Sequence, residues 1–434
     1  MEMKEKFLAL LKQEVKPALG CTEPIAVALG VATSCEALRS AGVEPQHLEA
    51  SVSANILKNG MGVGIPGTGM VGLHIAIALA AVCGKSEYGL EVLKDLDMEA
   101  VAKAKGIVDA GKVTVSLAET DEKLYIKATA SAGDHIAQTV VSGAHDHISS
   151  VVLDGQQLRG ETEGNADETT DGGEALEPDF AKKITLKQIY AFATETPLED
   201  IAFIDESIRL NKALSTEGLT HDYGLKVGKT IRSTSHSNVY GDSILTHAMA
   251  CTAAASDARM AGCTLPAMSN SGSGNQGITV TMPVISVAER LGISGEKLTR
   301  ALVLAHLVAI HIKGHLGKLS ALCGCVIAST GSSCGIVYLK GGGYDQICSA
   351  VKNMIGNITG MVCDGAKEGC ALKVASGVSC SIQSAVLALD GICISSNDGI
   401  IEDDIEKTIT NLGNIGSKGM QTTDEMILDI MVCK

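Results

Sequence analysis

The sequence predicts an α+β protein, with a mainly helical domain in the C-terminal half and a smaller α/β domain near the N-terminus. Two observations predict this architecture. Between residues 112 and 154, apolar side chains alternate with polar ones and turn residues interrupt them, which indicates three or four half-buried strands. Beyond residue 181, apolar residues recur at helical spacing in segments 186–194, 197–214, 240–260, 283–292, 296–313, 343–359 and 377–390.

An acidic segment separates the two patterns. Between Glu161 and Asp179 there are eight carboxylates and no basic residue, together with several glycines, a composition typical of a flexible connection. We therefore expect N-terminal helices at 1–44 that pack on the helical domain, an α/β domain at 45–155, a flexible acidic linker at 156–180 and a helical domain at 181–434.

Charge and composition exclude several classes of partner. The 434 residues include 35 basic and 50 acidic side chains, a net charge of −15, which argues against nucleic acid and anionic membranes. Apolar runs such as 71–83 are too short to span a bilayer. The first residues are typical of an amphipathic helix rather than a secretory leader, so we expect a cytoplasmic protein. Fourteen cysteines then indicate a reducing, anaerobic setting rather than disulfides.

Pairs of cysteines in glycine-containing turns predict a metal site. Cys363 and Cys370 bracket a short charged loop, and Cys323 lies with Cys325 in a turn after an apolar helix. Soft thiolates select zinc, copper(I) or iron–sulfur clusters. A structural zinc site is normally closed by four ligands, whereas three thiolates leave a metal position open for chemistry. The spacing alone does not decide between Cys323, Cys325 and Cys334 as the third ligand.

A polar stretch at residues 269–277 contains only Ser, Asn, Gln and Gly. Such a stretch presents backbone amides and short polar side chains, a typical nest for an anion. We expect it to bind the substrate, together with the end of the strand-like piece at 49–55 and the end of the helix at 296–313. The candidate substrate contacts are Asn55, Ser271, Ser273, Asn275, Gln276 and His315.

Cys21 is the candidate catalytic residue. It precedes a helix predicted at 24–42, with Thr22 as the N-cap, and the dipole at a helix N-terminus favours a thiolate. The alternative is a small residue that fills a turn. A glycine pattern at residues 62–67 is formally a dinucleotide fingerprint, but Pro66 interrupts it and no acidic residue follows at the required distance. It is either a loop near a small anion or a structural turn.

Four motifs in this order resemble the L-cysteine desulfidase family, which is related to the α chain of iron–sulfur L-serine dehydratases. They are residues 20–24, the stretch 269–277, the turn at Cys323, and Cys363 with Cys370, and the resemblance runs nearly end to end. It implies an oxygen-sensitive [4Fe-4S] cluster on Cys323, Cys363 and Cys370, with one iron free to bind substrate and Cys21 as the catalytic thiol. It also implies elimination of hydrogen sulfide from L-cysteine to give pyruvate and ammonia without pyridoxal phosphate.

Three alternatives to this function stay open. The same fold acting as an L-serine dehydratase differs only in its substrate. A zinc-binding or cluster-binding regulator would need the cysteines but not the polar stretch. A globular protein with buried thiols would bind no metal. We expect a small amino acid as the partner, and a homodimer is possible. The active site is expected between the two domains, because Cys21 must reach the C-terminal cysteines.

Overall fold

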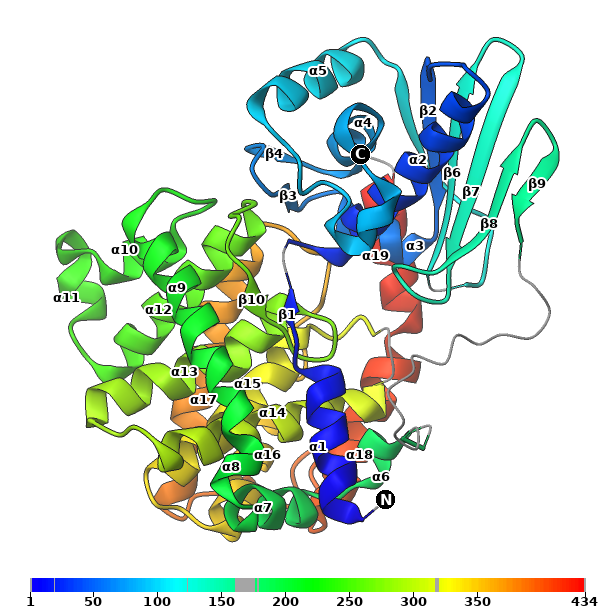
Figure 1. Cartoon of the computed structure of the whole chain (residues 1–434). Helices are drawn as coiled ribbons and strands as arrows, with labels where there is room; N and C mark the ends of the chain where they lie inside the picture. Colours follow the sequence, from blue (N-terminus) through cyan, green and yellow to red (C-terminus); the bar gives the residue numbers. More distant parts are fainter. Residues whose placement is uncertain are drawn as a thin grey trace.

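The computed structural model describes residues 2–18, 20–122, 124–160, 176–177, 179–316 and 320–432. One part carries a six-stranded sheet, and a larger body consists of helices (Figure 1). The sheet comes from the first third of the chain, and most of the helical body comes from the rest. The chain is therefore α+β, as the sequence predicts.

The sheet has the strand order β5-β2-β6-β7-β8-β9. β2 and β5 run parallel, whereas the other neighbouring strands run antiparallel. Every second residue of β6 is buried, so one face of the sheet points inward. The strands are β2 (His47–Val52), β5 (Val113–Leu117), β6 (Tyr125–Ala132), β7 (His135–Ser142), β8 (Ile148–Leu153) and β9 (Gln156–Arg159).

Two apolar helices, α2 (Thr22–Ser40) and α4 (Leu73–Cys83), cover the inner face, and α5 (Met98–Asp109) packs on α4 (Figure 1). A Cβ atom at Gly30 would lie 3.2 Å from the Cβ of Ala128, so small residues let α2 approach the sheet closely. The expectation that both N-terminal helices pack on the helical domain is wrong for α2. Its apolar residues share the core of the sheet, because a helix that is apolar on most sides needs a broad apolar surface.

The predicted acidic linker is shorter than expected at both ends. Gln156–Arg159 form β9, an exposed edge strand whose polar residues show no alternation that a sequence pattern could reveal. Residues 161–175 and 178 lie outside the described residues. Phe180 begins α6 (Phe180–Lys183) and contacts Phe7 of α1 (Met3–Glu14), with ring centroids 5.9 Å apart. In this way α1 joins the core of the helical body.

α15 (Gly324–Leu339) is the central helix of the helical body and is buried along nearly its whole length. It contacts α13 (Gly274–Leu291), α14 (Glu296–Leu316), α16 (Tyr344–Ile358) and α17 (Cys370–Leu389). A Cβ atom at Gly331 would lie 2.4 Å from the carbonyl oxygen of Ala305, so this contact requires glycine. The sequence pattern did not predict α15, because its serines and glycines give no apolar period.

The remaining helices of this body follow the predicted segments in part. The predicted helix at 197–214 is divided into α8 and α9. α13 and α17 begin at Gly274 and Cys370 rather than at residues 283 and 377, since their first turns are polar or small and carry no apolar period. The other helices are α7 (Leu186–Glu195), α8 (Leu198–Ile201), α9 (Glu206–Thr220), α10 (Val227–Arg232), α11 (Ser237–Tyr240), α12 (Ile244–Met260) and α18 (Ile405–Asn414).

Several contacts join the two parts of the molecule. β1 (Pro17–Ala18) pairs antiparallel with β10 (Ala267–Met268). α19 (Gln421–Val432) reaches α3 (Ala54–Gly60), where Asp424 forms an ion pair with the buried Lys58. The glycine pattern at 62–67 forms a hairpin of β3 (Gly64–Ile65) and β4 (Met70–Val71). A Cβ atom at Gly64 would lie 2.4 Å from the backbone of Ala261, so glycine is required for the hairpin to pack against the end of α12.

Among the described residues, one helix is long and apolar enough by composition to cross a membrane, namely α17. It contacts α12, α15 and α16 within the helical body, which is the environment of a core helix. A location in the cytoplasm stays a prediction.

Candidate active site

Two of the predicted ligands lie on paired segments. The backbone amide of Cys323 donates to the carbonyl of Met361 at 2.9 Å, and the amide of Cys363 donates to that of Ala321 at 2.6 Å. These bonds flank an antiparallel bridge between Leu322 and Val362. Cys323 and Cys363 are therefore diagonal neighbours on one face of the pair, a position in which Cα atoms lie about 7–8 Å apart.

Cys370 is the first residue of α17, at the end of the loop that begins at Cys363. The loop passes close to α3, since a Cβ atom at Gly365 would lie 2.2 Å from the carbonyl oxygen of Lys58. The positive φ of 92° at Gly365 also favours glycine. The third predicted ligand is thus positioned by the sheet-bearing part as well as by the helical body.

Three of the predicted cysteines share a local setting at helix N-termini. Cys21 is the N-cap of α2, Cys323 is the N-cap of α15 and Cys370 begins α17. The unpaired amides and the dipole at a helix N-terminus favour a thiolate. Cys21 and Cys370 also pack in one small cluster with Val63 and Met260, so the first and last of these helices meet.

The neighbouring cysteines that the sequence left as alternatives are used in packing. The Cys325 thiol donates to the carbonyl of Lys373 at 3.1 Å and lies against Gly377 of α17. Burial raises the pKa of Cys325 to about 12. Cys334 is fully buried eleven residues beyond Cys323 along α15, about 16 Å at the helical rise. Cys323 is therefore the cysteine of α15 that lies beside Cys363.

A small charged network surrounds the paired cysteines. The Lys373 ammonium donates to the carbonyl of Val362 at 2.8 Å and pairs with Asp364. Burial would raise the pKa of Asp364, but Lys367 and Lys373 together lower it to about 2. Burial raises the pKa of Cys323 well above its usual value, the thiols of Cys325 and Cys363 raise it further, and Lys373 opposes them.

The Cys21 thiol donates a hydrogen bond to the Glu23 carboxylate at 3.1 Å. Burial raises the pKa of Cys21 far above its usual value, Glu23 raises it further, and the nearby Arg259 lowers it. The effects of burial and Glu23 oppose the helix dipole, which favours a thiolate, because desolvation and a carboxylate both disfavour a second negative charge there.

The polar stretch forms a turn and the first turn of α13. Ser273 caps this helix by accepting a hydrogen bond from the amide of Gln276. The buried Asn270 side chain holds the turn, since it accepts from Gln276 Nε2 at 2.7 Å and donates to His306 Nδ1 at 3.0 Å. Burial lowers the pKa of His306 to about 3, so this imidazole is neutral and accepts through Nδ1.

This turn lies between Cys21 and Cys323. The amide of Ser269 donates to the carbonyl of Lys16, and the β1–β10 pair that follows carries the chain toward Cys21. On the other side, a Cβ atom at Gly324 would lie 3.2 Å from Gln276 Oε1. Gln276 therefore links the polar turn to the residue after Cys323.

The other predicted substrate contacts differ in their surroundings. Ser271 lies in the turn with a positive φ of 49°, and its hydroxyl donates to Asn270 Oδ1. The buried Oδ1 atom of Asn275 has no hydrogen-bond partner. Asn55 lies at the start of α3 and bonds to Asn59.

His315 lies apart from the polar turn. It is nine residues beyond His306 on α14, about 13 Å at the helical rise, and its ring contacts that of His311. Burial lowers the pKa of His315 to about 4. These surroundings lend its predicted contact with substrate no support.

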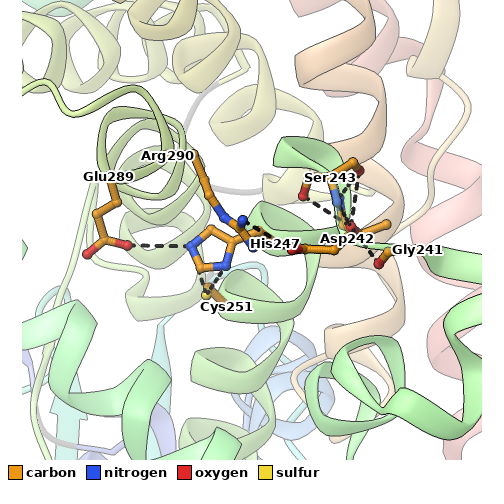
Figure 2. A network of polar contacts seen from close by, with 8 residues as sticks. Gly241, Asp242, Ser243, His247, Cys251, Glu289 and Arg290 are labelled. Atoms are coloured by element: carbon orange, nitrogen blue, oxygen red, sulfur yellow. Dashed lines mark hydrogen bonds and ion pairs between the residues drawn. The ribbon is translucent and has the colours of Figure 1, made fainter.

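A second cysteine–histidine group lies elsewhere, at the ends of α12 and α13 (Figure 2). The two ring nitrogens of His247 lie 3.8 and 3.9 Å from Cys251 Sγ, and His247 Nε2 lies 3.5 Å from Glu289. Burial raises the pKa of Cys251 and lowers that of His247, so both groups are neutral. This network fastens two helices and lacks the ion pair that activates a nucleophilic cysteine.

The predicted ligands are thiols in a setting that suits thiolates. Within the described ranges, no three His, Cys, Asp or Glu side chains meet closely enough to hold one metal ion. A four-iron cluster is wider than an ion, so its thiolate ligands stand further apart. The diagonal placement of Cys323 and Cys363, the helix N-termini and the charge of Lys373 all suit thiolates around such a group.

Three residues of this region were not predicted from the sequence as functional. Glu23 accepts from the Cys21 thiol, Asn270 accepts from Gln276, and Arg259 donates to the carbonyl of Gly20, next to Cys21. Glu23 and Asn270 lie within the motifs quoted above, so their position was a usable signal. Arg259 lies with Asp257 at the end of an alanine-rich helix, and charged residues among so many alanines are themselves a signal.

A family model described as the serine dehydratase alpha chain matches residues 87–429. A UPF0597 protein of Bacteroides fragilis is 50% identical over 438 residues, covering 99% of this chain and 98% of that protein. UPF0597 proteins of Phocaeicola vulgatus and Oleidesulfovibrio alaskensis are 51% and 49% identical, with the same coverage. Because the family match covers most of the chain and these relatives align end to end, the chain belongs to the serine dehydratase alpha-chain family, a family of lyase-type enzymes.

Proposed function

We propose that this protein catalyses β-elimination from a small amino acid, with L-cysteine as substrate and hydrogen sulfide, pyruvate and ammonia as products. One observation carries the proposal. Cys21, the polar turn and the cysteines of the C-terminal half meet although they are far apart in the sequence. A β-elimination requires a base, a binding site for the substrate carboxylate and a Lewis acid. In this proposal the Cys21 thiol, the polar turn and the C-terminal cysteines would supply them in that order.

Cys323, Cys363 and Cys370 would hold a [4Fe-4S] cluster, because three thiolates leave one iron without a protein ligand. When bound, the cluster supplies a Lewis acid toward the substrate. Cys21 and Cys323 are buried and Cys363 and Cys370 are partly buried, so water has limited access to the reacting groups, which strengthens the charge interactions there.

The Cys21–Glu23 pair is the base of this proposal. Glu23 accepts the thiol proton along the 3.1 Å hydrogen bond, and the resulting sulfur anion faces Arg259. The sulfur then takes the Cα proton of the substrate. A Cα–Cβ double bond forms while the Cβ–S bond breaks, and its electron pair leaves with the sulfur as hydrosulfide. The 2-aminoacrylate takes up a proton at Cβ and hydrolyses to pyruvate and ammonia.

L-Serine is the second candidate substrate, and the description of the matched family favours it. The two amino acids share their carboxylate and amine, and differ only in the leaving atom. Every contact described for the polar turn therefore applies to both.

The experiment is anaerobic reconstitution with iron and sulfide, followed by parallel assays of pyruvate from L-cysteine and L-serine. Sulfide release with L-cysteine is the expected result. Turnover of L-serine alone would move the protein to the dehydratases. A failure to take up iron would refute the cluster and the reaction together.

Variants separate the roles of the cysteines. Cys323→Ser, Cys363→Ser and Cys370→Ser are expected to lose bound iron, whereas Cys325→Ser keeps it, because that sulfur packs on α17. Cys21→Ala is expected to keep the iron and lose turnover. Loss of iron in Cys21→Ala would make this residue a ligand and leave the base elsewhere.

A further inference from the structure

Arg259 is a buried cation at the N-terminus of α13. The residue is 7% exposed, and its Nη2 group donates to the carbonyl of Gly20 at 2.8 Å. Its Nε group has no hydrogen-bond partner. A Cβ atom at Gly274 would lie 2.2 Å from Nε, so the edge of the guanidinium packs directly against the first residue of α13, a contact that requires glycine.

This position is electrostatically unfavourable without an anion. Arginine does not lose its proton in proteins, and the N-terminus of a helix carries partial positive charge. The N-terminus of α2, which begins beside Cys21, adds a second positive end. None of the ion pairs found among the described residues involves Arg259, and Glu23 is hydrogen-bonded to the Cys21 thiol instead. No carboxylate in the described part of the chain therefore pairs with Arg259, whose polar neighbours include the carbonyl of Gly20 and the Cys21 thiol.

Two other arginines of the helical body, Arg300 and Arg290, are paired with carboxylates. The Arg300 guanidinium pairs with Glu296 and donates to the carbonyls of Ala193 and Thr196, both at 2.9 Å. Arg290 pairs with Asp242 on the surface. Arg259 differs from both because its free donor points toward the polar turn that carries the unpaired oxygen of Asn275.

We propose that Arg259 and the first turn of α13 bind the α-carboxylate of the amino-acid substrate. This inference rests on the proposed function for the identity of the ligand. The guanidinium supplies the charge, and the amides at the start of α13 supply further donors. An unpaired amide oxygen at Asn275 is suited to accept from the α-ammonium group of the same ligand. Arg259 would thus select free amino acids over their amides and esters.

The test uses the iron-free protein, so it does not depend on turnover. Calorimetric titrations compare L-serine with L-serinamide, which keeps the amine and hydroxyl but lacks the negative charge. The wild-type protein is expected to bind L-serine roughly 10- to 100-fold more tightly than the amide, the range for losing a charge-assisted contact. Arg259→Gln is expected to lose this preference, and Arg259→Lys is expected to retain part of it.

Arg300→Gln is the matched control, because it removes a mostly buried guanidinium with comparable carbonyl contacts away from the site. It is expected to bind L-serine as the wild type does, and circular dichroism establishes that each variant is folded. A folded Arg259→Gln that keeps the preference for the acid overturns the proposal. So does a wild-type protein that binds the acid and the amide equally, or neither. If the binding result holds but the reconstituted enzyme shows no turnover, the carboxylate site stands and the proposed reaction fails.

Discussion

Replacing Asn270 by alanine removes the side chain that holds the polar turn. Asn270 is 0% exposed, and its amide connects Gln276 in α13 with His306 in α14. In Asn270→Ala, Gln276 Nε2 and His306 Nδ1 both lose a partner inside the protein. Each buried polar group without a partner costs about 1–3 kcal/mol, so we expect a loss of about 2–6 kcal/mol in the free energy of unfolding.

The assay is equilibrium unfolding in urea of the iron-free protein, followed by circular dichroism. The reconstituted variant is also assayed for pyruvate formation, which we expect to be lost because the turn that carries Ser271 and Ser273 is no longer held. These two measurements separate stability from positioning.

Asn353→Ala is the matched control. Asn353 is 4% exposed and makes two hydrogen bonds to the backbone of Ile392 and Ile394, in a part of the helical body outside the polar turn. We expect this variant to lose a comparable amount of free energy of unfolding. The molecules that remain folded should still form pyruvate at the wild-type rate. An Asn270→Ala protein within about 0.5 kcal/mol of the wild type, the usual range for surface substitutions, would refute the reasoning.

Three further predictions concern stability. Burial lowers the pKa of His306 in the folded state, so the wild-type protein loses stability as the pH falls below about 6.5, by up to about 1.4 kcal/mol per pH unit. In His306→Gln the free energy of unfolding in urea should differ less between pH 6 and pH 5 than it does in the wild type. Burial raises the pKa of Asp257 to about 6, so its charge destabilises the fold above that pH. Asp257→Asn keeps an acceptor for the amide of Gly228, and its free energy of unfolding should exceed that of the wild type by about 2 kcal/mol at pH 8 and by less at pH 5. An equal gain at both pH values would contradict this reasoning. A Cβ atom at Gly377 would lie 2.4 Å from Cys325 Sγ, so Gly377→Ala should cost about 1–3 kcal/mol in thermal unfolding, and adding Cys325→Ala should restore part of the loss.

Local patterns in the amino-acid sequence suffice to predict the class of the fold and the types of side chain at the site. Alternation predicted the central strands, because the side chains of a half-buried strand must point in turn to the core and to water. The polar stretch and the cysteine pairs were recognisable for the same local reason: their composition suits neither a core nor a solvated linker. α15 and the first turns of α13 and α17 were missed, since serine, glycine and cysteine carry no apolar period there.

Which of these residues lie together depends on the tertiary structure. The bridge between Leu322 and Val362 distinguishes Cys323 from Cys325, and the β1–β10 pair brings Cys21 beside the polar turn. The tertiary structure also places Cys21 where burial and Glu23 raise the pKa of its thiol, against the effect of the helix dipole. These outcomes depend on pairing between residues that are distant in the sequence, as Pro17 and Met268 are, and on desolvation. Local sequence patterns contain neither kind of information.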